Sequence, residues 1–109
     1  MTNSRQKGAR YEREIAKDLR EHGYDARRGC QYSGANGDAD VIGVPGLHIE
    51  CKHVERLDIY KAMAQSEADA RPGEVASVFW RKNGKPTLVT VKEDDFLALW
   101  KRGEDGEGK

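Results

Sequence analysis

The sequence predicts an α/β protein in which one mixed β-sheet is flanked by helices. Segments with apolar residues at helical spacing alternate with short apolar runs of strand length. Two tight turns, Pro45-Gly46 and Asn83-Gly84, each separate two such runs and predict two hairpins. The expected order is α-β-β-β-α-β-β-α, and a sheet covered by helices buries the apolar faces of both.

The first helix is expected over residues 8–22. Tyr11, Ile15 and Leu19 recur at every fourth position and form an apolar stripe. Gly23 follows, at the position where a glycine commonly ends a helix. A short strand at 24–28 and a loop rich in Gly, Ser and Asn come next.

The later elements follow from the same signals. They are strands at 40–44 and 47–54, a helix at 57–70, strands at 74–81 and 87–91, and a closing helix at 94–102. At 109 residues the chain has room for one core, so we expect residues 1–102 to form a single domain. The acidic residues 103–109 are expected to be a disordered tail.

The charge balance limits the classes of function. The chain has 19 basic and 19 acidic residues, which argues against a protein that coats nucleic acid. Residues 1–28, however, hold eight basic and five acidic residues, an excess of three positive charges that can meet phosphates. With no signal peptide and no apolar run of membrane-spanning length, we expect a cytoplasmic protein.

The strand expected at 47–54 has one apolar and one polar face, because side chains alternate across a strand. The apolar face carries Leu47, Ile49 and Cys51, and the polar face carries His48, Glu50 and Lys52. A solvent-exposed surface strand would show the same alternation. An aspartate at the start of the neighbouring strand would instead complete a metal-dependent hydrolytic site. Asp40 is preferred to Asp38 because it directly precedes the apolar pair Val41-Ile42.

Cysteine-ligated zinc is not expected. Cys30 and Cys51 have no CxxC partner, and the three histidines are not grouped as a zinc site requires. Cys51 is interpreted as a small apolar residue on the core side of its strand.

Four motifs occur in a characteristic order. They are Lys7-Gly8-Ala9-Arg10-Tyr11-Glu12-Arg13, Ser33-Gly34, Asp38-Ala39-Asp40-Val41 and Ile49-Glu50-Cys51-Lys52. This order resembles the PD-(D/E)XK nuclease superfamily, and most closely the archaeal-type Holliday junction resolvases and their phage-encoded relatives. The resemblance spans residues 7–91, although Ala39 stands where the family's motif has proline. It implies a restriction-endonuclease-like fold.

The resemblance implies a Mg²⁺-dependent DNA endonuclease in which Mn²⁺ substitutes for Mg²⁺. Asp40, Glu50 and the Cys51 carbonyl would supply the oxygen ligands that such hard cations take. Lys52 would polarise the attacking water and stabilise negative charge. The resemblance also brings Ser33 to the scissile phosphate, whereas the residue pattern alone shows only a loop serine.

Glu12 is a further candidate ligand. It lies beside the buried stripe of the first helix, whereas Glu14 projects toward solvent. A glutamate at this place also suits the helix dipole without any metal. The resemblance places a metal-linked or water-linked glutamate here. Gln65 in the next helix either neighbours the site or faces solvent.

Junction DNA and a second copy of the chain are the expected partners. Phosphate contacts are expected from Lys7, Arg10, Arg27, Arg28, Arg81 and Lys82. Because a four-way junction has two symmetric scissile phosphates, we expect a homodimer. Its interface would use the helix at 60–68 or the strands around Trp80. The alternatives are a nicking or duplex endonuclease of the same fold, and a non-catalytic DNA-binding module.

Overall fold

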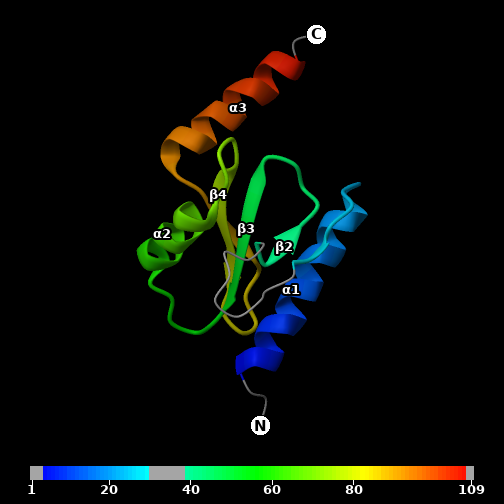
Figure 1. Ribbon diagram of the computed structural model, residues 1–109, viewed down its shortest axis with the longest axis vertical. Helices are drawn as coiled ribbons and strands as arrows, with labels where there is room; N and C mark the ends of the chain where they lie inside the picture. Colours follow the sequence, from blue (N-terminus) through cyan, green and yellow to red (C-terminus); the bar gives the residue numbers. More distant parts are fainter. Residues whose placement is uncertain (1–3, 30–38, 108–109) are drawn as a thin grey trace.

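A five-stranded mixed sheet forms the centre of the protein (Figure 1). The computed structural model describes residues 4–29 and 39–107. The strand order is β1-β2-β3-β4-β5. The pair β3–β4 is parallel, and the other neighbours are antiparallel. The mixed sheet flanked by helices and the predicted order of elements are confirmed.

The helices and strands follow one another as expected, with shifted boundaries. They are α1 Ser4–Glu21, β1 Arg27–Arg28, β2 Val41–Ile42, β3 Leu47–His53, α2 Ile59–Asp69, β4 Val75–Arg81, β5 Leu88–Thr90 and α3 Glu93–Glu107. Both predicted hairpins form, and each of their turns contains a glycine with positive φ, Gly46 at 81° and Gly84 at 73°.

The predicted end of the first helix is confirmed. Gly23 has a φ of 98°, which L side chains rarely adopt, and its N–H donates to the Arg20 carbonyl at 3.0 Å. The next N–H, that of Tyr24, donates to the Leu19 carbonyl at 3.1 Å. α2 begins two residues later than expected because Asp58 caps it, accepting from the Lys61 N–H at 3.1 Å.

The second predicted strand is shorter than the sequence indicated. Gly43 has a φ of 104°, and a Cβ there would collide with the backbone carbonyl of Asp25. This close approach ends β2 at Ile42. Asp40 precedes β2, yet both of its backbone groups are hydrogen-bonded. Its carbonyl accepts the Gly29 N–H at 2.9 Å, and its N–H donates to the Ile49 carbonyl at 3.0 Å. The direction of its side chain is therefore fixed.

The closing helix is longer than predicted. α3 continues through Glu107, so residues 103–107 are helical and not part of a disordered tail. An isolated glycine such as Gly103 costs a helix only about 1 kcal/mol, which does not have to end it. Residues 108–109 lie outside the described part of the chain.

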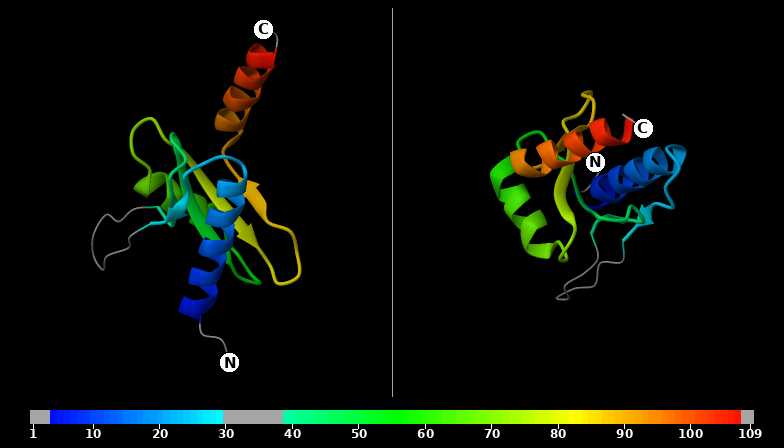
Figure 2. Two further views of the ribbon diagram at one scale, coloured as in Figure 1. Left: turned by 90° about the vertical axis from the view of Figure 1, so that its right-hand side faces the viewer. Right: turned by 90° about the horizontal axis from the view of Figure 1, so that it is seen from above.

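The helices α1 and α2 cover opposite faces of the sheet (Figure 2). On one face, Tyr11 and Ile15 of α1 pack with Val41, Ile49 and Cys51. The core on the other face is made by Ala62, Met63, Ala76 and Val78. The apolar side of β3 faces the core, as predicted, and this core is the one that α1 covers, whereas the polar side lies toward α2. Within the described residues, no helix is long and apolar enough to cross a membrane.

Candidate active site

Two buried carboxyl groups meet where β2 and β3 pair. Asp40 and Glu50 are only 8% and 5% exposed, and the charge of Glu50 acts on the Asp40 carboxyl. Asp40 Oδ2 also accepts the Cys51 N–H at 2.8 Å. Burial, followed by the charge of Glu50, raises the pKa of Asp40 to about 7. Because burying two negative charges side by side is costly, this oxygen-rich pair fits a hard divalent cation.

Glu12 approaches the same pair from α1. Its largely buried side chain accepts a hydrogen bond from Arg28 Nε at 3.0 Å, and its charge contributes to the raised pKa of Asp40. Burial, then the charges of Asp40, Glu12 and Glu50, raise the pKa of the Cys51 thiol far above its ordinary value. The sequence therefore brings three carboxylates around Cys51, whose side chain stays a neutral thiol.

Glu12 lies inward and Glu14 toward solvent, as the sequence predicted. Glu14 is exposed and forms an ion pair with Arg81 at 3.5 Å between Oε2 and Nη2. Only Glu12 of the two turns toward the carboxyl pair.

Lys52 lies on the Glu50 face of β3, as the alternation predicted. It borders a cavity of about 240 Å³ whose lining includes Gln65, Lys61 and Ala62 of α2. Gln65 lines this cavity with Lys52 but is exposed, so neither of its two interpretations is favoured over the other. Ser33 and Asp38 lie outside the described residues, so the preference for Asp40 rests on its own burial and hydrogen bonds.

His48 is a buried partner of Glu50 that was not among the site residues predicted from the sequence. It is 3% exposed, and its Nε2 donates to Glu50 Oε1 at 2.8 Å. The hydrogen bond with Glu50 raises the pKa of His48. The signal was present in the sequence, because residues two apart on a strand share a face.

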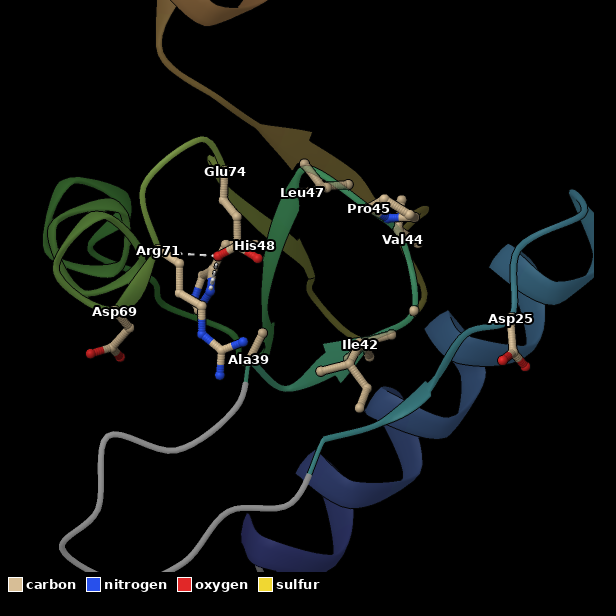
Figure 3. Close-up of a pocket in the computed structure, with 12 residues that line it drawn as sticks. Asp25, Ala39, Ile42, Val44, Pro45, Leu47, His48, Asp69, Arg71 and Glu74 are labelled. Carbon is tan, nitrogen blue, oxygen red and sulfur yellow. Dashed lines mark hydrogen bonds and ion pairs between the residues drawn. The ribbon is translucent and has the colours of Figure 1, made fainter.

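The turn after α2 closes over His48. Glu74 Oε1 lies 3.8 Å from His48 Nδ1 and accepts the Arg71 N–H at 2.8 Å (Figure 3). These residues belong to the wall of a cavity of about 350 Å³. Possible ligand atoms of His48, Glu50 and the exposed Asp69 all lie within 4.8 Å of one another. Glu50 is thus held between Asp40 on one side and this polar group on the other.

The basic residues predicted to contact phosphates differ in their exposure and in their partners within the protein. Arg27 and Arg28 are exposed on β1, where Arg27 pairs with Asp25 at 3.5 Å. Arg10 and Lys82 are exposed, and Lys7 is half-buried. Arg81 is mostly buried, and its guanidinium lies 5.6 Å from the centre of the Tyr11 ring. Arg81 therefore also joins β4 to α1.

Comparison with known proteins agrees with this arrangement. The sequence model of the archaeal Holliday junction resolvase (Hjc) family matches residues 3–94. Among solved structures, the fold is similar to that of Hjc from Archaeoglobus fulgidus, described as a Holliday junction resolvase from an archaeal hyperthermophile. The identity is 21% and the TM-score 0.53, over 78% of this chain and 72% of that one. No match was found among curated proteins. The resemblance indicated by the motifs is confirmed: the chain belongs to the archaeal Holliday junction resolvase family and is a metal-dependent, structure-specific junction endonuclease.

Proposed function

We propose that Asp40, Glu50 and the Cys51 carbonyl hold the catalytic divalent cation, with Glu12 as a further direct or water-linked ligand. The observation that supports this most strongly is the burial of two interacting carboxyl groups, those of Asp40 and Glu50, which are 8% and 5% exposed. We propose Mg²⁺ as the ion, with Mn²⁺ as a substitute, because carboxylate and carbonyl oxygens suit both. When bound, the cation would acidify a water molecule and neutralise charge on the phosphate.

The remaining side chains have separate roles in this proposal. Lys52, on the Glu50 face of β3, polarises the attacking water and stabilises the negative charge that develops on the phosphate. The Cys51 N–H holds Asp40 in position through its 2.8 Å hydrogen bond. Arg28 restrains Glu12 through the contact at 3.0 Å. Ser33 approaches the scissile phosphate.

The substrate is junction DNA, and the proposed active assembly is a homodimer in the cytoplasm. Two symmetric sites suit the two symmetric cuts that resolve a four-way junction. The basic residues Lys7, Arg10, Arg27, Arg28, Arg81 and Lys82 bind phosphates around each site. Binding should therefore weaken steeply as the salt concentration rises.

A cleavage assay with matched variants tests the assignment. Purified protein is mixed with a four-way junction, a linear duplex of the same sequence, a nicked duplex and a single strand, with Mg²⁺ or with chelator. Asp40→Asn, Glu50→Gln and Lys52→Met should each abolish junction cleavage while retaining DNA binding. Asp25→Asn, at an almost fully exposed position, is the control and should cleave as wild type does. Cleavage by Asp40→Asn at the wild-type rate would refute the site, and equal cutting of duplex and junction would indicate the nicking or duplex endonuclease.

A further inference from the structure

The cavity beside Lys52 has a basic lining. It measures about 240 Å³ and lies at the carboxyl end of β3, against the beginning of α2. Its charged residues are Lys52, Arg56, Lys61 and Asp58, three basic residues against one acidic residue. Arg56 and Lys61 are exposed, so a ligand in solution can reach them. A hollow with this charge balance suits an anion, and the anion that DNA supplies is a backbone phosphate.

The acidic residues on either side of Arg56 are held by backbone donors. Asp58 caps α2 and accepts the Lys61 N–H at 3.1 Å. Glu55 reaches the turn between β4 and β5 and accepts the Asn83 N–H at 2.7 Å. Among the residues that the structure describes, neither Arg56 nor Lys61 makes an ion pair. Both basic groups therefore stay available to an anion from outside the protein.

The cavity at the other end of β3 has the opposite charge balance. It measures about 350 Å³, and its charged residues, leaving His48 aside, are three acids and one base, Asp25, Asp69, Glu74 and Arg71. Along the strand, Glu50 lies between the two cavities, since His48 borders one and Lys52 the other. An acidic hollow repels a phosphate, so the cut strand should run from the metal site toward Lys52 and Arg56.

We propose that the basic cavity holds the phosphate next to the scissile phosphate on the cut strand, with Arg56 and Lys61 as its ligands. Lys52 lies about 7 Å along β3 from Glu50 on the same face, between the metal site and the cavity. The planar guanidinium of Arg56 can donate two parallel hydrogen bonds to phosphate oxygens, and Lys61 adds a second positive charge. Such contacts fix the position of a strand without reading its bases.

Arg56 and Lys61 are thus positioning residues that determine which phosphate enters the metal site. This inference deepens the proposed function and rests on it, because Asp40 and Glu50 define the scissile phosphate. Junction binding is measured in chelator, without cleavage, so the two proposals can fail separately. A protein that binds one phosphate through Arg56 and cuts no junction would refute the metal site alone. Cleavage without that contact would refute the cavity alone.

The salt dependence of junction binding tests the charge of the cavity. Arg56→Gln and Lys61→Gln should each weaken binding by about tenfold and lower the slope of log affinity against log salt by about one for each occupied site. Arg102→Gln and Lys101→Gln remove the same side chains from α3, which projects from the α/β body (Figures 1 and 2). These controls should leave affinity and slope unchanged. Wild-type behaviour of both cavity variants would overturn the proposal, as would equal losses in the controls.

A single neutral linkage in the DNA tests which phosphate the cavity holds. Junctions are made with one uncharged methylphosphonate at each position on either side of the mapped cut. Next to the cut, this linkage should weaken binding by wild type about tenfold and by Arg56→Gln only slightly, because the partner of that phosphate is already lost. Arg102→Gln should respond as wild type does. Equal losses for wild type and Arg56→Gln at every position, or coupling only to a phosphate far from the cut, would overturn the proposal.

Discussion

Replacing Asp40 with asparagine should stabilise the metal-free protein while it abolishes cleavage. The pKa of Asp40 is raised from 3.8 to about 7, mainly by burial. The unfolded chain releases this proton at a lower pH than the folded protein does, so stability should fall as pH rises from about 4 to 7. A shift of about 3 pH units corresponds to roughly 4 kcal/mol at pH 8 in the absence of metal.

The expected gain is smaller than this upper value. Asparagine carries no charge to desolvate, and its amide oxygen can still accept the Cys51 N–H that Asp40 accepts at 2.8 Å. The amide group is a weaker acceptor, however, and Glu50 remains buried beside it. We therefore expect Asp40→Asn to raise the free energy of unfolding by about 1–3 kcal/mol at pH 8. At pH 4, where the aspartate is protonated in the folded protein, the gain should largely disappear.

Urea unfolding in chelator at pH 4, 6 and 8 measures the effect. Asp25→Asn is the control, since its carboxylate is almost fully exposed and should contribute little at any of these pH values. Added Mg²⁺ should stabilise wild type and leave Asp40→Asn nearly unchanged. The argument from burial would be refuted if Asp40→Asn were less stable than wild type at pH 8. It would also be refuted if the stability of wild type did not fall from pH 4 to pH 8 relative to the control.

Three further predictions concern single residues. Glu12→Gln should slow single-turnover cleavage strongly and Glu14→Gln only slightly, because only Glu12 lies beside Asp40; the reverse order would show that the wrong face of α1 was chosen. His48→Ala should raise the metal concentration needed for half-maximal cleavage by about tenfold, because losing a side chain that orients a metal ligand commonly weakens metal affinity by at least this factor. An unchanged metal titration would show that His48 does not support the site. Gly43→Ala should lower the free energy of unfolding by about 2 kcal/mol or more, because Gly43 has a positive φ and an added Cβ would collide with the Asp25 carbonyl. Gly8→Ala, in open space within α1, should instead raise the free energy of unfolding by about 0.5–1 kcal/mol. Equal effects of the two variants in urea unfolding would contradict this.

Local sequence patterns predicted the elements that carry the site. The alternation along residues 47–53 placed Glu50 and Lys52 on one face, and the apolar stripe of α1 placed Glu12 inward. These assignments held because a period of two or of four residues is a property of the segment itself.

The features that the sequence did not reveal depend on distant contacts. β2 is short because Gly43 approaches the Asp25 backbone, eighteen positions away along the chain. His48 is buried because the turn carrying Glu74 lies over β3. Spacing along one strand cannot indicate which later turn covers it, and the same holds for the projection of α3.

The most direct test of the central claim is metal-dependent cleavage of a four-way junction by wild type and Asp40→Asn under single-turnover conditions. Wild type should cut the junction in Mg²⁺, should cut the matched linear duplex far more slowly, and should cut neither in excess chelator. Asp40→Asn should bind the junction with nearly wild-type affinity and leave it intact. Cleavage by that variant at the wild-type rate, or by wild type in chelator, would contradict a metal centre at Asp40 and Glu50.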